Sequence, residues 1–223
     1  VAVGGNMAVS GYSVADKLTP AEQALYQDML VVGGNLDFTS GRVYYGNVVV
    51  GGQANLGHDN VADGSVSTQV NPLPVDFAAE AAYLKALSVN LSGLPATGTA
   101  TNQWGGWKLS GDGSSDLQVF HLDGAELLEN AWGIEAANIP ADATVIINIS
   151  GMTAGFENMN FENGAISLKS IQERVLFNFY EAHSLTMSGV AVRGSILAPF
   201  AAVNNPQGVI WGTIIADSWN GPM

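Results

Sequence analysis

Cysteine is absent from the 223-residue sequence, and charged residues are scarce. The absence of cysteine excludes disulfides, thiolate metal sites and cysteine nucleophiles. Charged residues make up 12% of the chain, about half of the roughly 25% that is usual in globular domains. Because Glu and Lys usually solvate helical surfaces, their scarcity favours a fold of short strands whose surface carries Asn, Ser, Thr and Gly.

Basic residues are the rarer of the two charge types, with 7 Lys and Arg against 20 Asp and Glu. The resulting net charge of −13 leaves few cations to neutralise nucleic-acid phosphates, and it repels an anionic membrane surface. No apolar run reaches the length of about 18 residues that a membrane-spanning helix needs. We therefore expect no nucleic-acid partner and no membrane insertion by this domain.

Short internal repeats occur near both ends of the chain. An apolar residue followed by Gly-Gly and an amide recurs at residues 3–6, 32–35 and 50–53. The second and third copies lie 18 positions apart, and so do the related segments 194–199 and 212–217. A period of this length is typical of one coil of a β-solenoid, with three short strands joined by turns.

Two helices are expected beside the repeats. The first two Gly-Gly copies lie 29 positions apart, an excess of 11 residues. A capping box at residues 19–22 predicts an inserted helix over residues 20–30, which accounts for that excess. Asp76 is a good N-cap for a longer helix over residues 77–87, which Gly93 and Pro95 follow. Its expected apolar stripe consists of Phe77, Ala81, Leu84 and Leu87.

The rest of the chain is expected to be β-structure. Alternating or continuous apolar patterns predict strands at residues 117–122, 144–149 and 175–180. No linker long enough to separate two domains occurs. Residues 1–223 are therefore expected to form a single β-solenoid domain, which we interpret as a piece excised from a larger protein.

Eight segments, in this order, resemble the choice-of-anchor A domain of bacterial surface and secreted proteins. They are residues 1–6, 30–52, 75–88, 117–127, 139–151, 174–182, 193–203 and 208–221. The second half is also similar to the ice-binding β-solenoid family. The resemblance implies a mainly β protein, a right-handed β-solenoid (β-helix) with one long amphipathic helix along its side and a short inserted helix. It also implies a secreted or cell-surface location in bacteria.

Calcium is the ligand that the acidic turns favour. Asp112 and Asp116 supply hard oxygen ligands at short spacing, and the loop of Asp59, Asn60 and Asp63 offers a second set. The simpler interpretation is that Asp and Asn are good turn residues. Asp112 and Asp116 are the preferred metal ligands, and no other cofactor is expected.

Threonine and tryptophan residues are the other binding candidates. Thr97, Thr99 and Thr101 alternate, so in a strand they would share one face, as an ice-binding surface requires. Exposed tryptophans can stack on sugars, but Trp104 and Trp107 are expected to close the core over the longer helix. Trp132, Trp211 and Trp219 are further aromatic candidates, and Trp219 could face a neighbouring segment.

No catalytic set is evident. The sequence lacks a G-x-S-x-G motif, and His58, His121 and His183 have no metal-binding spacing. Residues 57–59 offer only a weak similarity to the catalytic loop of a solenoid polysaccharide-cleaving enzyme. We expect a non-enzymatic extracellular adhesion or structural module of a bacterial cell-surface protein, whose partner is an extracellular surface, a glycan or a protein. The alternative is a ligand-binding solenoid that recognises ice or a glycan on a flat face.

Overall fold

The computed structural model describes residues 1–222, apart from the side chains of His58 and Asn130. The chain is mainly β, with 46% of its residues in strands and 17% in helices. Its contacts fall into two compact units, residues 1–81 and 82–223, which are described separately below. The expectation of one continuous domain stays a prediction.

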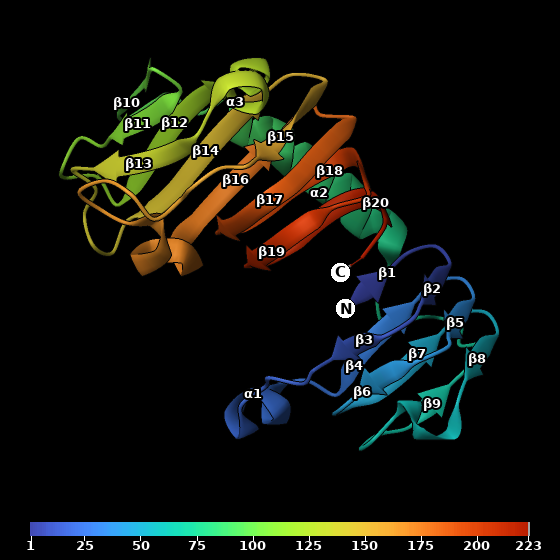
Figure 1. Ribbon diagram of the computed structural model, residues 1–223. Helices are drawn as coiled ribbons and strands as arrows, with labels where there is room; N and C mark the ends of the chain where they lie inside the picture. Colours follow the sequence, from blue (N-terminus) through green and yellow to red (C-terminus); the bar gives the residue numbers. More distant parts are fainter. Residues whose placement is uncertain (223) are drawn as a thin grey trace. The chain divides into compact units, whose positions relative to one another are not determined.

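Three parallel sheets form the first unit, and the chain passes through them in order. The first sheet contains β1 (Ala2–Val3), β4 (Asp28–Val32), β7 (Asn47–Val50) and β9 (Val66–Ser67). The second contains β2 (Met7–Val9), β5 (Leu36–Phe38) and β8 (Ala54–Leu56). The third contains β3 (Tyr12–Val14) and β6 (Gly41–Val43), and the 3-10 helix η1 spans His58–Asn60. Figure 1 shows these strands in blue and cyan.

Strand register in the first unit confirms the repeat. Val31 lies opposite Val49, and Val49 lies opposite Ser67, so neighbouring strands are 18 positions apart. Ala2 lies opposite Val31, which reproduces the longer first interval of 29. Since Tyr12 also lies 29 positions from its partner Gly41, the extra residues fall between β3 and β4.

The inserted helix is real but shorter than the sequence pattern predicts. Helix α1 spans Pro20–Leu25 and begins with the expected capping box between Thr19 and Glu22. The extension of this helix to residue 30 is wrong, because Tyr26 is already extended and Met29 and Leu30 are buried in β4. Burial of these two side chains in the core outweighs their helical spacing.

A ladder of amide side chains explains the Gly-Gly repeats. Asn6 Oδ1 accepts a hydrogen bond from Asn35 N at 2.8 Å, and Asn35 Oδ1 accepts one from Gln53 N at 2.9 Å. A Cβ atom on Gly33 would lie 2.3 Å from the carbonyl oxygen of Gly4. The two glycines of the second and third repeats therefore let each turn stack closely enough on the preceding one for the amide ladder to form.

A curled, mainly parallel sheet dominates the second unit. Its strands follow the order β12 (Leu117–Asp123), β14 (Thr144–Ser150), β16 (Val175–Phe179), β18 (Ser195–Asn204), β17 (Ser184–Arg193) and β15 (Thr153–Glu157). Two further strands pair with it, β19 (Gln207–Trp211) with β17 and β20 (Ile214–Asn220) with β18. The three strands predicted at residues 117–122, 144–149 and 175–180 are confirmed as β12, β14 and β16.

Smaller elements flank this sheet. A three-stranded sheet contains the antiparallel hairpin of β10 (Thr99–Gln103) and β11 (Gly106–Ser110), with β13 (Gly133–Ala137) parallel to β11. Helix α3 (Gly124–Asn130), which the sequence analysis missed, is capped by Asp123, whose side chain accepts from two backbone amides. The 3-10 helix η2 spans Leu168–Arg174. Phe156, Phe161, Phe177 and Phe179 pack edge to face in the core.

The long helix α2 (Phe77–Ser92) begins after Asp76, as predicted, and its C-terminal half contacts the curled sheet through polar side chains. Figure 1 shows it in green behind the strands. Asn178 Nδ2 donates to Ser88 O at 2.9 Å, Asn148 Nδ2 donates to Leu91 O at 2.9 Å, and His121 Nε2 lies 2.9 Å from Leu94 O.

The expected apolar stripe of this helix is wrong in detail. Ala81 is exposed, Leu84 and Leu87 are only half-buried, and the buried residue is Ser88. The reason is that the sheet presents a polar row to the helix, so a small hydroxyl side chain fits where a large apolar one was expected. Ser88 Oγ donates to Asn178 Oδ1 at 2.6 Å.

Candidate binding faces

A row of small side chains crosses four strands of the curled sheet. Thr153 on β15 lies opposite Ser184 on β17, which lies opposite Ala202 on β18, which lies opposite Ser218 on β20. Thr153, Ser184 and Ser218 are exposed, and Ala202 is half-buried. Neighbouring strands lie about 4.8 Å apart, so the row repeats at that interval.

Further small polar residues point to the same side, because side chains alternate along a strand. Thr186 follows Ser184 by two positions, and Asn204 follows Ala202 and lies opposite Asn220. Ser188 lies opposite Glu157, which places a single acid at the margin. We call this surface the hydroxyl face; it comprises Thr153, Ser184, Thr186, Ser188, Ala202, Asn204, Ser218 and Asn220.

The polar groups of the hydroxyl face are not used by the fold. Among the described residues, the side chains of Thr153, Ser184, Thr186 and Ser218 have no hydrogen-bond partner. Their hydroxyl groups are therefore free to bond with an outside surface or with ordered water.

The first unit also has a shallow groove, but four of its polar side chains already form hydrogen bonds within the stack. The groove lies over β2, β5 and β8 and has a volume of about 390 Å³. Asn6 and Asn35 accept hydrogen bonds within the amide ladder, and Asn55 Nδ2 donates to Asp37 Oδ1 at 2.9 Å. These groups stabilise the stacked turns, which makes this groove the weaker binding candidate.

Only part of the expected threonine face forms. Thr99 and Thr101 are on β10, at outward positions of the three-stranded sheet. Both border a shallow groove of about 360 Å³. Thr97 precedes the strand, and its Oγ1 accepts a hydrogen bond from Val119 N at 2.8 Å. Thr97 is therefore used in holding two segments together, and its expected place on a shared face is wrong.

The two neighbouring tryptophans have opposite environments. Trp107 is buried in the core of the second unit, as expected, whereas the expectation for Trp104 is wrong because Trp104 is 97% exposed. Trp104 is in the two-residue turn between β10 and β11, with a φ of +51°. Hairpin turns of this kind point their side chains outward, which a sequence pattern of apolar residues alone does not reveal. Trp219 packs partly buried against the core.

Asp112 organises its own turn. Its Oδ1 accepts hydrogen bonds from Ser114 N and Ser115 N at 2.9 Å each and from Gln118 Nε2 at 2.8 Å. Its Oδ2 accepts one from Ser115 Oγ. These bonds, with those from Ser115 first, lower the pKa of the Asp112 carboxyl well below its ordinary value. The role of Asp112 as a turn residue thus accounts for the partners of both its carboxylate oxygens without a bound ion.

Two of the other expected metal ligands also form hydrogen bonds within the chain. The backbone oxygen of Asp116 accepts from Thr144 N, and the side chain of Asn60 donates to Gly41 O at 2.8 Å. Within residues 1–222 as described, no three His, Asp or Glu side chains form a group that could hold a metal. Calcium at Asp112 and Asp116, or at the loop of Asp59 and Asp63, stays a prediction.

The histidines serve local contacts where they are described. His121 contacts the end of helix α2, as given above, and His183 stacks on Phe200 with ring centroids 6.3 Å apart. The weak catalytic similarity at residues 57–59 depends on the side chain of His58, which lies outside the described residues. The described histidines thus act as structural residues.

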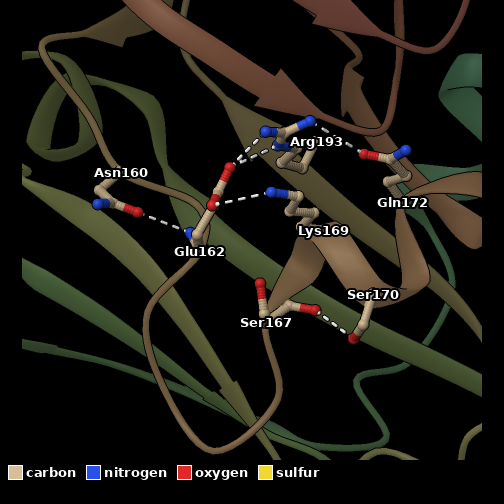
Figure 2. A network of polar contacts seen from close by, with 7 residues as sticks. All are labelled: Asn160, Glu162, Ser167, Lys169, Ser170, Gln172 and Arg193. Atoms are coloured by element: carbon tan, nitrogen blue, oxygen red, sulfur yellow. Dashed lines mark hydrogen bonds and ion pairs between the residues drawn. The ribbon is translucent and has the colours of Figure 1, made fainter.

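A charged network anchors a loop of the second unit. Figure 2 shows Arg193 pointing toward Glu162, with which it forms an ion pair. Glu162 Oε2 also forms an ion pair with Lys169 Nζ at 3.5 Å. The hydrogen bond from Arg193 lowers the pKa of the Glu162 carboxyl. Arg193 is buried, stacks on Trp211 at 5.0 Å and donates to Gln172 at 3.4 Å. Because every charged group here has a partner within the chain, the network stabilises the loop and η2.

No helix of the described chain is both long enough and apolar enough to cross a membrane. All 223 residues match the family described as "Putative Ice-binding-like adhesive domain". No curated protein and no solved structure matches the chain at a significant level. The chain belongs to the family of ice-binding-like adhesive domains.

Proposed function

We propose that this chain is a non-enzymatic adhesive module that acts outside a bacterial cell, secreted or displayed on its surface. The observation that carries the proposal is the hydroxyl face, together with the family match. Adhesion to a solid surface needs many weak contacts made at once, because their summed strength far exceeds that of each contact. An array of hydroxyl groups without partners in the described chain supplies such contacts.

The chemistry of this face favours a hydrated, uncharged surface as its target. The face contains hydroxyl and amide groups with Ala202 between them, and its marginal acid is Glu157. Hydroxyl groups donate and accept hydrogen bonds in either direction, so they match other hydroxyl groups or ordered water without a fixed charge pattern. The net charge of −13 disfavours an anionic target.

The proposal includes two narrower assignments. The parallel stacks and the 18-residue register support a right-handed β-solenoid with α2 along its side. The order of the matching segments supports membership in the choice-of-anchor A group of bacterial surface proteins. Neither assignment changes the contact surface, since the hydroxyl face is set by the strand register alone.

The test measures retention of the whole chain on monolayers of defined chemistry. Hydroxyl-, methyl- and carboxylate-terminated monolayers on gold are loaded with protein and washed, and retained mass is followed by surface plasmon resonance. We expect retention to be highest on the hydroxyl surface and lowest on the carboxylate surface. Equal retention on all three surfaces, or none on the hydroxyl surface, would contradict the proposal.

Ice is the second candidate target, and the four-strand row favours it. Thr, Ser, Ala and Ser at one interval across β15, β17, β18 and β20 form the regular, uncharged pattern that ice binding requires. If ice is bound, the whole chain shows thermal hysteresis in a nanolitre osmometer. If a seed ice crystal grows as soon as the temperature falls below the melting point, at every protein concentration, ice is ruled out as the target.

A further inference from the structure

A second surface of the molecule has the features of a ligand site, and it is distinct from the hydroxyl face. It is the outward side of the sheet formed by β10, β11 and β13. Thr99 lies opposite Ser110, which lies opposite Ala137, and in the adjacent row Thr101 lies opposite Lys108, which lies opposite Glu135. These six residues, with Gly164 and Ala165, border the groove of about 360 Å³, within the range of roughly 300–1,000 Å³ of small-molecule sites.

The polar side chains around this groove are unengaged. Among the described residues, Thr99, Thr101, Lys108, Ser110 and Glu135 form no side-chain hydrogen bond or ion pair. Rows two residues apart on a strand lie about 7 Å apart. The groove therefore presents hydroxyl donors and acceptors, an ammonium and a carboxylate around a floor of small residues, all free to bond with a ligand.

Two tryptophans lie at one end of this sheet. The ring of Trp132 occupies the place of a side chain at Gly106, because a Cβ atom there would lie 2.3 Å from Trp132 Cζ2. Gly106 precedes Lys108 by two positions, so this ring covers the same outward side as the groove. Trp132 Nε1 donates to the carbonyl of Trp104 at 3.0 Å and thereby holds the turn that exposes the Trp104 ring.

We propose that this groove binds a neutral saccharide. One sugar residue of an oligosaccharide would lie against the tryptophans through its C–H face. The hydroxyl groups of its following sugar residues would bond with Thr99, Thr101, Lys108 and Glu135 in the groove. Aromatic side chains with exposed faces suit such stacking, and hydroxyl groups that donate and accept suit a mixed set of side chains. The proposal deepens the adhesive function by naming a class of partner, and it rests on that function for its biological role.

Charge favours a neutral ligand over an anionic one. Lys108 and Glu135 lie opposite each other, so the groove has no excess of positive charge. The net charge of −13 adds a repulsive background for acidic polysaccharides. A polysaccharide rich in carboxylate or sulfate groups would need a cluster of basic side chains, and Lys108 is the one cation among the lining residues.

The first experiment uses the whole chain on a printed array of neutral oligosaccharides with terminal glucose, galactose or mannose. The best oligosaccharide is then titrated while tryptophan fluorescence is recorded. We expect Trp104→Ala to weaken binding at least tenfold, which corresponds to about 1.4 kcal/mol. The matched control is Tyr83→Ala, which removes another exposed ring, on helix α2, and should leave the affinity unchanged.

The second experiment tests the hydroxyl groups without disturbing the strand. The double substitution of Thr99→Val and Thr101→Val keeps the β-branched shape that strands favour and removes two hydrogen-bonding groups. We expect it to weaken binding at least fivefold and to leave the thermal unfolding midpoint unchanged. Thr144→Val, which removes an exposed hydroxyl at the start of β14, should leave both unchanged.

Each outcome bears on one claim. The saccharide proposal is overturned if the wild-type chain binds no oligosaccharide, or if Trp104→Ala binds as tightly as the wild type. If the wild-type chain binds no oligosaccharide but is retained on the hydroxyl-terminated monolayer, the adhesive function stands without the saccharide site. If saccharide binds but no monolayer retains the chain, the adhesive function fails and the saccharide site stands.

Discussion

Gly33 and Gly5 have different surroundings although they belong to the same repeated motif. A Cβ atom on Gly33 would lie 2.3 Å from the carbonyl oxygen of Gly4, whereas one on Gly5 would meet nothing within 4 Å. The difference arises because Gly5 is in the first turn of the stack and Gly33 is in the second. The sequence shows the repeat, but it does not show which of its glycines is confined.

We predict that Gly33→Ala destabilises the chain and that Gly5→Ala does not. The added methyl group at residue 33 must push two backbone turns apart, and overpacking of this kind costs about 1–3 kcal/mol or more. Urea unfolding of both variants, followed by far-UV circular dichroism, measures the difference. Equal midpoints would mean that the turns do not stack as closely as described.

The Glu162–Arg193 pair gives a pH-dependent prediction. Hydrogen bonding from Arg193 lowers the pKa of Glu162 below its ordinary value of 4.5. Because the folded-state pKa is the lower one, the stabilisation is complete above pH 4.5 and disappears as the pH falls through the folded-state value. Glu162→Gln should therefore lower the urea midpoint at pH 7, and its difference from the wild type should shrink below pH 4.5.

The matched control for this pair is Glu129→Gln, which neutralises an exposed acid on helix α3. Its urea midpoint should stay close to that of the wild type at each pH. A Glu162→Gln variant whose difference from the wild type is constant from pH 7 to pH 3 would show that the contact with Arg193 is not ionic.

Helix α2 fits the curled sheet because two repeat distances nearly coincide. The bonded carbonyls, at Ser88 and Leu91 in the helix and at Leu94 just after its last residue, are three residues apart in the sequence. Three residues of a helix rise about 4.5 Å, close to the spacing of about 4.8 Å between strands. One polar side chain from each of three neighbouring strands can therefore reach a helix carbonyl.

Local signals in the sequence predicted where the helices begin better than how they pack. Asp76 and the capping box at Thr19 mark both starts correctly, because capping depends on neighbouring residues. The polar row could have been found from polar residues at matching positions of three apolar strands, namely His121, Asn148 and Asn178. Its partners on the helix could not, because they are main-chain carbonyls that any residue carries.

We predict that Asn178→Leu loosens helix α2. Asn178 is fully buried and bonds with Ser88 and with Asn148 Oδ1 at 2.7 Å. Each buried group left without a partner costs about 1–3 kcal/mol. Hydrogen exchange measured by mass spectrometry should show faster exchange in residues 82–92. The added substitution Ser88→Ala should restore part of the protection, and unchanged exchange in the single variant would contradict this role of Asn178.

At the scale of the whole molecule, the binding faces depend on register. The four residues of the central row are Thr153, Ser184, Ala202 and Ser218, and none of them lies within a repeated motif. The 18-residue period predicted the stacking of strands, but it did not predict which outward positions align, because turns of unequal length separate the later strands. The expected threonine face at residues 97–101 was local, whereas the hydroxyl face is assembled across four strands.

The central claim is that the chain adheres through the hydroxyl face. Ser184→Lys places a long charged side chain at the middle of that face, and Asn163→Lys adds the same charge on an exposed loop outside it. Retention on the hydroxyl-terminated monolayer is the measurement that compares them. We predict that Ser184→Lys lowers retention at least tenfold while Asn163→Lys matches the wild type; equal retention of both variants and the wild type would contradict the account.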